Sequence, residues 1–161
     1  MPLFEKQGAL HVLLTERTHS VEHHKGQISF PGGARDSADA SIIETALRET
    51  EEEIGLPREG VEVLGTWNDV WTPTGFVITP VVGFLSSVPL LKLNSHEVAH
   101  ILEVPVALFL NPTKERIEQK VRDGKRFDIY HYDFGGTEIW GATAWITRSI
   151  LAEAVALAEG N

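Results

Sequence analysis

Alternating apolar and polar residues predict short strands on both sides of a central helix. Runs with a period of two that end at glycine, proline or other turn residues are typical of strands. The expected strands are residues 11–15, 27–30, 61–71, 75–85, 99–104, 126–132 and 138–140. A short helix is expected from Pro105, and the alanine-rich segment 142–159 should close the chain as a helix. This order in a chain of 161 residues favours a single domain, residues 1–161, of α+β or α/β sandwich class.

The central helix has two faces of different character. Its capping residues lie in the segment 38–41, and Gly55 is suited to its end. On a helical wheel at 100° per residue, the core-facing positions span an arc of about 100°, and the carboxylates span another, offset by roughly 120°. The core-facing residues are Ile43, Ala46, Leu47, Thr50 and Ile54, and the carboxylates are Glu49, Glu52 and Glu53. Arg48 precedes Glu52 by four residues, so that its guanidinium can brace that carboxylate.

Carboxylates crowded on one helix face repel each other, and no lysine lies between Arg35 and Pro57 to offset them. A divalent cation would resolve the repulsion, because Mg²⁺ and Mn²⁺ prefer carboxylate oxygens. The alternative is an acidic face in contact with solvent. Gly32 and Gly33 precede the helix and leave the backbone bare, so that a carbonyl could reach a metal or an N–H group a phosphate. A plain tight turn is the alternative for these glycines.

Composition narrows the classes of function. The net charge of −9 disfavours binding to a nucleic-acid backbone, although solubility alone would also explain it. The absence of cysteine excludes disulfides and thiolate sites. The longest apolar stretch, residues 76–85, is far shorter than the roughly 20 residues of a membrane span, and the first residues lack a signal-peptide pattern. We therefore expect a cytoplasmic protein that binds neither nucleic acid nor membrane.

The segment from Gly33 to Leu56 resembles the Nudix box. Its closing half reads Arg48-Glu49-Thr50-Glu51-Glu52-Glu53-Ile54-Gly55-Leu56. The chain departs from the general pattern by one extra residue between Gly33 and Arg48, by Asp39 in place of the first glutamate, and by Thr50 at an apolar position. The extra residue falls before the helix, so the three glutamates keep their register. The resemblance leaves Asp39 without an assigned role.

A narrower resemblance is to the coenzyme A pyrophosphatase branch of the Nudix hydrolases. The residues that carry it are 13–17, 24–33, 74–76, 80–82, 97–98, 103–105 and 139–144. This resemblance implies the α/β/α Nudix fold, an α+β arrangement with a mixed sheet between helices. It also implies metal-dependent hydrolysis of coenzyme A, or of its thioesters, to 3′,5′-ADP and 4′-phosphopantetheine or its acyl form. Members of that branch usually carry more residues before the first motif, so the chain is interpreted as a short or truncated member that lacks an opening strand.

The resemblance also assigns roles to individual residues. It places Mg²⁺ or Mn²⁺ on Glu49, Glu52, Glu53 and the carbonyl of Gly32, where the ions would neutralise the diphosphate and activate a water molecule. Arg48 belongs to the same catalytic set, and Glu97 corresponds to a downstream acid that serves as an extra ligand or general base. The residues expected to bind substrate are Arg17, His23, His24, Lys25 and Gly33. An ordinary loop, and a surface glutamate at position 97, are the alternatives.

Three functions compete on the sequence. The first is coenzyme A pyrophosphatase, and the second is hydrolysis of another nucleoside diphosphate derivative such as ADP-ribose. The third is a nucleotide-binding module without turnover, which the intact Glu49, Glu52 and Glu53 argue against. The sequence is compatible with a monomer or a homodimer. The four tryptophans, residues 67, 71, 140 and 145, are expected in the core, with Trp71 as the alternative candidate to face an adenine.

Overall fold

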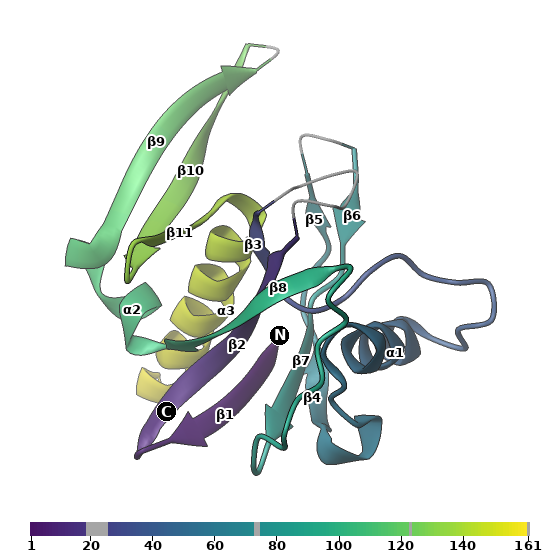
Figure 1. The fold of residues 1–161 in the computed structure, drawn as a ribbon. Helices are drawn as coiled ribbons and strands as arrows, with labels where there is room; N and C mark the ends of the chain where they lie inside the picture. Colours follow the sequence, from purple (N-terminus) through teal and green to yellow (C-terminus); the bar gives the residue numbers. More distant parts are fainter. Residues whose placement is uncertain (19–25, 73–74, 123, 161) are drawn as a thin grey trace. The chain divides into compact units, whose positions relative to one another are not determined.

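The computed structural model describes residues 1–18, 26–72, 75–122 and 124–160 (Figure 1). The chain divides into two compact units, Met1–Val104 and Pro105–Asn161, and each is described by itself. The single domain expected from the length stays a prediction. In the first unit the elements are β1 (Pro2–Lys6), β2 (Ala9–Arg17), β3 (Ile28–Ser29), α1 (Ile42–Ile54), η1 (Arg58–Gly60), β4 (Glu62–Thr66), β5 (Val70–Trp71), β6 (Val77–Ile78), β7 (Val81–Leu85) and β8 (Val98–Pro105).

The first unit is built on a mixed sheet. Its strand order is β3-β2-β1-β7-β4, with β8 also paired to β2. Strand β1 runs parallel to β7 and antiparallel to β2. The pairings of β2 with β3 and of β4 with β7 are also antiparallel. A separate two-stranded ribbon is formed by β5 and β6. The combination of this sheet with helices places the fold in the α+β class.

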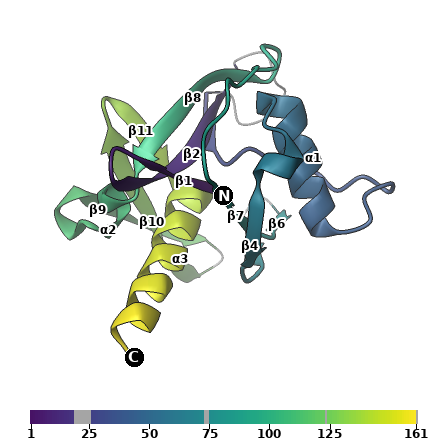
Figure 2. The same cartoon turned by 90° about the horizontal axis from the view of Figure 1, so that it is seen from below.

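Helix α1 joins the sheet through one shared core. It contacts β7 (Figure 2), and Ile54 at its end is fully buried. The members of this core are Phe4, Leu13, Ile54, Leu56, Leu85 and Val98. They come from α1, the residue pair after it and strands far apart in sequence, so burial of apolar surface fixes α1 on the sheet. Of the predicted core-facing positions, Thr50 and Ile54 are buried, while Ile43, Ala46 and Leu47 are half-buried.

The two ends of α1 are where the sequence predicts them. Ser41 is the N-cap, and its hydroxyl accepts a hydrogen bond from the Glu44 N–H at 3.2 Å. Gly55 has a φ of 67°, and its N–H donates to the Glu51 carbonyl at 2.9 Å. A β-carbon at position 55 would also press on the backbone of Lys92. Both ends are therefore fixed, and with them the rotation of the carboxylates about the helix axis.

The second unit combines a small sheet with two helices. Its elements are α2 (Ala107–Leu110), η2 (Pro112–Lys114), β9 (Glu115–Arg122), β10 (Lys125–Phe134), β11 (Thr137–Trp140) and α3 (Gly141–Glu159). The strands form an antiparallel sheet in the order β11-β10-β9, and α3 contacts β10, β11 and α2. Tyr132 on β10 packs edge-on against Phe109, and Arg148 of α3 lies 4.8 Å from the ring centre of Tyr130.

Two strands were not predicted from the sequence, and the predicted strands and helices are otherwise confirmed in place. Pro2–Lys6 forms β1, which lies between β2 and β7 in the sheet, so the residues before position 11 do contribute a strand. The charged segment Glu115–Arg122 forms β9. The long runs 61–71 and 75–85 are each divided into two short strands. None of the helices among the described residues has both the length and the apolarity needed to cross a membrane.

The expectation that all four tryptophans belong to the core is wrong. Trp71 is 77 % exposed on the ribbon formed by β5 and β6, and Trp140 and Trp145 are each more than one third exposed. Trp67 is half-buried. Smaller aliphatic side chains fill the core of the first unit instead. A role for Trp71 beside an adenine stays a prediction.

Candidate active site

Two glutamates of α1 lie against the glycine loop that precedes the helix. Glu53 is 3 % exposed, and its Oε2 accepts a hydrogen bond from the Gly32 N–H at 3.0 Å. Gly32 has a φ of 148°, a conformation that favours glycine. A β-carbon at position 33 would overlap with the Glu49 carboxylate. The two glycines therefore let the backbone approach both carboxylates closely.

Glu97 lies in a segment that is tied to the end of α1 through Asn94. The Asn94 N–H donates to the Glu53 carbonyl at 2.8 Å, and the Asn94 side-chain amide donates to Glu97 Oε1 at 2.9 Å. The Glu97 carbonyl in turn accepts from the Thr18 N–H at 2.8 Å, at the end of β2. Asn94 therefore links the backbone of one carboxylate residue to the carboxylate of another. No sequence motif marked it for this role.

The charge state of Glu53 reflects this crowding. Burial and, to a lesser extent, the neighbouring carboxylates of Glu97 and Glu49 raise the pKa of Glu53 to about 7. The Gly32 N–H and the Arg17 guanidinium act in the opposite direction and favour the charged form. Glu49 and Glu97 are thus both within electrostatic range of Glu53, although Glu97 is 44 residues beyond Glu53.

Arg17, expected to bind substrate, lies beside a carboxylate. Its Nη1 is 3.7 Å from Glu53 Oε1, and its side chain is 27 % exposed at the end of β2. Its Nε is buried and has no hydrogen-bond partner within the described part of the chain. The predicted neighbours of Arg17 in substrate binding, His23, His24 and Lys25, lie outside the described residues.

Arg48 organises the outer side of the site. Its Nε and Nη2 each donate to one oxygen of Asp39 at 2.9 Å, and its Nη1 donates to Glu49 at 2.8 Å and to Glu52 at 3.1 Å. The brace between Arg48 and Glu52 is therefore present at the predicted spacing. Glu52 is the outermost of the three predicted ligands, with a side chain that is 59 % exposed.

Asp39 is the residue whose role the sequence left open. Besides its bidentate pair with Arg48, it accepts the Asp36 N–H and the Thr45 hydroxyl, both at 2.9 Å. The Arg48 hydrogen bonds and the Asp36 N–H hold the pKa of Asp39 well below its usual range. Asp39 thus anchors the guanidinium that holds Glu49 and Glu52. A helical wheel could not reveal this pair, because Asp39 lies nine residues before Arg48 and outside the helix.

A divalent cation matches the chemistry of this group. A nearly buried carboxylate with two acidic neighbours and a close backbone is a donor set that hard cations prefer. Across residues 1–18, 26–72, 75–122 and 124–160, no three His, Asp or Glu side chains already have the spacing to hold a metal ion. Glu49 is instead drawn to Arg48, and Glu53 to Gly32 and Arg17. The carboxylates that could bind a metal therefore interact with N–H and guanidinium groups of the chain itself.

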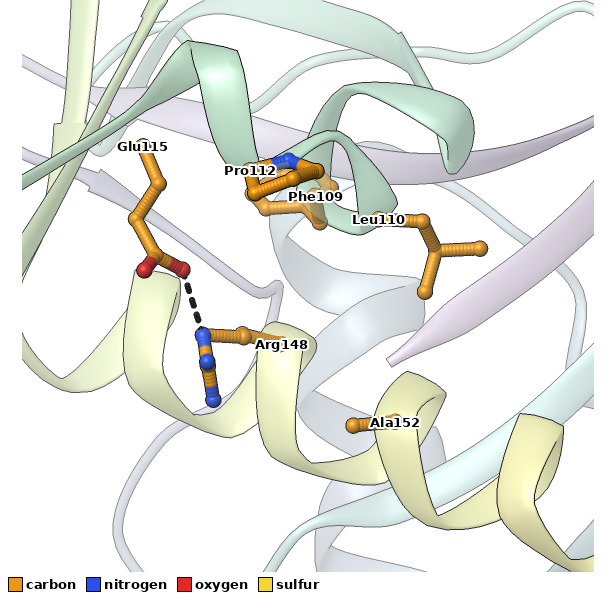
Figure 3. A pocket seen from close by; sticks show the side chains of 6 residues that line it. All are labelled: Phe109, Leu110, Pro112, Glu115, Arg148 and Ala152. Carbon is orange, nitrogen blue, oxygen red and sulfur yellow. Dashed lines mark hydrogen bonds and ion pairs between the residues drawn. The ribbon is translucent and has the colours of Figure 1, made fainter.

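A cavity in the second unit holds none of the residues predicted from the sequence. It encloses about 250 Å³ and is lined by Phe109, Leu110, Pro112, Glu115, Arg148 and Ala152. Figure 3 shows Arg148 and Glu115 pointing toward each other on its polar side. Glu115 also accepts the Tyr132 hydroxyl at 2.7 Å. The two charged side chains that line the cavity are thus paired with each other.

Comparisons with known proteins agree with the sequence motif. The family described as "NUDIX domain" matches residues 1–129. The Nudix hydrolase NudL of Photorhabdus laumondii is 40 % identical over 139 residues, which cover 86 % of this chain and 74 % of that protein. NudL of Pectobacterium atrosepticum is 38 % identical over 139 residues, covering 86 % and 72 %. Neither name states a substrate.

Solved structures agree on the fold. A Nudix hydrolase from M. Smegmatis, RenU, is 28 % identical with a TM-score of 0.56, and the match covers 66 % of this chain and 68 % of that chain. The NUDIX domain of Shewanella oneidensis NrtR, solved with ADP ribose, is 26 % identical with a TM-score of 0.51, covering 68 % and 71 %. An Ap4A hydrolase of C. elegans has a TM-score of 0.56 at 16 % identity, covering 66 % and 76 %, and supports the fold alone.

Asp39→Asn should lower the melting temperature by a few degrees, because it removes the charge that anchors Arg48. Since the pKa of Asp39 is lowered in the folded protein, its contribution is complete above its ordinary pKa of 3.8 and decreases as the pH falls below that value. Calorimetry across pH measures both effects. Asp36→Asn is the matched control, since the Asp36 side chain contacts Ala38 and Ser37 rather than Arg48. Equal melting temperatures for Asp39→Asn and the unaltered protein at neutral pH would contradict the anchoring role.

Proposed function

Because the chain belongs to the NUDIX domain family, we propose that it hydrolyses the diphosphate of coenzyme A, or of a coenzyme A thioester, with Mg²⁺ or Mn²⁺ as its metal. The family makes the chain a pyrophosphohydrolase that depends on divalent metal and acts on nucleoside diphosphate derivatives. The substrate, the choice of metal, the roles of individual residues and a cytoplasmic location belong to the proposal.

The observation that carries the proposal is that Glu49 and Glu53 lie against the glycine loop, with Glu97 within electrostatic range of Glu53. Glu53 is almost removed from water, and its nearest hydrogen-bond donor is a backbone N–H group. Like charges are held this close only where the fold enforces it or a cation joins them. Because α1, the loop at Asn94 and the end of β2 together hold these carboxylates in place, the site is suited to bind divalent cations rather than a cationic side chain alone.

Each group of the chain then has a distinct task. Glu49 and Glu53 would hold the metal together with the exposed Glu52 and the backbone at Gly32. Bound there, the metal would neutralise the diphosphate oxygens and lower the pKa of a water molecule. Glu97, whose Oε1 accepts a hydrogen bond from the Asn94 amide, would accept the proton of the attacking water. Arg48 keeps Glu49 and Glu52 in position. No covalent protein nucleophile is required.

Support for coenzyme A as substrate comes from sequence outside the box. The segments 13–17 and 24–33, and further segments up to residue 144, are similar to the coenzyme A pyrophosphatase branch. Coenzyme A differs from other adenosine diphosphate derivatives by a 3′-phosphate and a pantetheine arm. The 3′-phosphate is a dianion and needs cationic donors. Near the box this acidic chain offers Arg17, His23, His24, Lys25 and Arg35.

ADP-ribose is the competing substrate. The NUDIX domain of NrtR, solved with ADP ribose, is 26 % identical to this chain, which favours ADP-ribose as the second candidate. Both molecules contain an adenosine diphosphate, so the carboxylates of α1 cannot discriminate between them. A panel of coenzyme A, dephospho-coenzyme A and ADP-ribose, assayed for phosphate products with Mn²⁺, separates the two. The proposal expects the largest kcat/KM for coenzyme A. Equal values for coenzyme A and ADP-ribose would contradict the substrate assignment and leave the family assignment unaffected.

Glu53→Gln should lower kcat by about two orders of magnitude or more, because it preserves the size of a buried side chain and removes the charge that a metal requires. Glu51→Gln is the matched control on the same helix, where Glu51 pairs with Arg58 outside the carboxylate group. Steady-state rates with saturating Mn²⁺ measure both variants. Full activity in a protein that carries both Glu52→Gln and Glu53→Gln would refute the metal role of the helix.

Lys25→Ala should reduce kcat/KM for coenzyme A by roughly tenfold to a hundredfold more than for dephospho-coenzyme A, since charge-assisted contacts are worth about 1.5–3 kcal/mol. Only coenzyme A carries the 3′-phosphate that the lysine would contact. Lys114→Ala, at an exposed position in the second unit, controls for the loss of one positive charge. If Lys25→Ala affects both substrates equally, Lys25 does not bind the 3′-phosphate.

A further inference from the structure

Arg17 makes an unusually poor ion pair for an arginine in a crowded acidic site. Arginine normally grips a carboxylate with two parallel hydrogen bonds. Arg17 instead lies 3.7 Å from one oxygen of Glu53, beyond hydrogen-bond length, and its buried Nε has no partner among the described residues. By contrast, Arg48 makes two 2.9 Å bonds to Asp39 and further bonds to Glu49 and Glu52.

Arg48 and Arg17 therefore have different roles in the site. Arg48 is fixed by several directional bonds and serves as a permanent structural brace. Arg17 is held near Glu53 by charge more than by directional bonding, and an unsatisfied buried N–H group makes its position costly. A group held in this way is ready to leave when another cation takes its place.

Glu53 needs a cation whenever it is charged. Of the described charged groups that act on it, Glu97 and Glu49 oppose its charged form, and Arg17 favours it. The Gly32 N–H supplies only a partial positive charge. The guanidinium of Arg17 is thus the charge that compensates Glu53 when no metal ion is bound.

We propose that Arg17 is a stand-in cation, which neutralises Glu53 in the metal-free protein and is displaced when a divalent metal binds the carboxylates of α1. At Glu53, Oε2 already accepts the Gly32 N–H and Oε1 faces Arg17, so a divalent ion would compete with Arg17 for Oε1, and the two cations would repel each other. Displacement frees Arg17 to contact an anionic group of the nucleotide. Metal binding thereby prepares the cationic part of the substrate site. This inference rests on the metal site proposed above, but not on coenzyme A as the substrate.

Displacement of Arg17 by metal predicts that Arg17 affects the affinity for metal, which an arginine that only bound substrate would not do. Two ligands that compete for one group weaken each other's binding by the same factor. Removal of Arg17 should therefore strengthen the binding of metal by the free protein, while it weakens the binding of a diphosphate substrate. A residue that only contacted phosphate would leave the affinity for metal in the absence of substrate unchanged.

The first test is calorimetric titration of Mn²⁺ alone into the unaltered protein, Arg17→Met and Arg58→Met. Arg17→Met should lower the Kd for Mn²⁺ by about tenfold, within the range typical of coupled sites. Arg58→Met is the matched control, because it removes an equal charge at a position that pairs with Glu44 and Glu51 of the same helix. It should change the Kd far less. An equal or higher Kd in Arg17→Met would overturn the proposal while leaving the metal site in place. A lack of Mn²⁺ binding by the unaltered protein would overturn both.

A second measurement does not depend on whether Arg17→Met folds. In the ¹⁵N-labelled unaltered protein, the Arg17 Nε–Hε resonance should move when Mg²⁺ saturates the site, since the guanidinium leaves Glu53. The spectrum of Arg17→Lys, which lacks that signal and keeps the positive charge, assigns the resonance. The Arg48 resonance should move less, because its bonds to Asp39 are retained. An Arg17 signal that is unchanged at saturating Mg²⁺ would overturn the proposal.

Discussion

The arrangement of the site depends on the need of one nearly buried carboxylate, that of Glu53, for a positively charged partner. Glu53 is 3 % exposed, and burial together with Glu97 and Glu49 raises its pKa to about 7. A charged group in such a place is stable only with compensation from the surroundings. The Gly32 N–H and the loosely placed Arg17 supply that compensation within the chain. A divalent ion would supply it more fully, which connects the electrostatics of the fold to a metal-dependent hydrolase.

The rest of the first unit holds that carboxylate in place. The core around Ile54 fixes the end of α1 on the sheet, and Gly55 ends the helix within contact distance of Lys92. Asn94 then joins the last turn of α1 to Glu97, and Asp39 anchors Arg48 on the outer side. The acidic groups thus depend on polar contacts from loops, while the apolar core only orients the helix that carries two of them.

The sequence predicted the features that depend on local spacing. The ends of α1, the shared side of Glu49 and Glu53, and the pairing of Arg48 with Glu52 follow from helical geometry and are present. Features that depend on contacts across loops were missed, namely the bond of Asp39 to Arg48 and the link from Asn94 to Glu97. Strand β1 was missed because its pairing partners, β2 and β7, rather than an alternating pattern, define it. The exposed Trp71 shows that size and apolarity alone do not place a residue in the core.

The position of a bound metal ion is the most direct test of the metal site proposed on α1. A crystal of the protein grown with Mn²⁺ would locate the ion by anomalous scattering. We expect an anomalous peak at about 2.1 Å from carboxylate oxygens of Glu49 and Glu53, the distance typical of small divalent ions with oxygen ligands. We also expect the Arg17 side chain to be turned away from Glu53. A peak remote from α1, or none at saturating Mn²⁺ with Arg17 still beside Glu53, would contradict the proposed metal site.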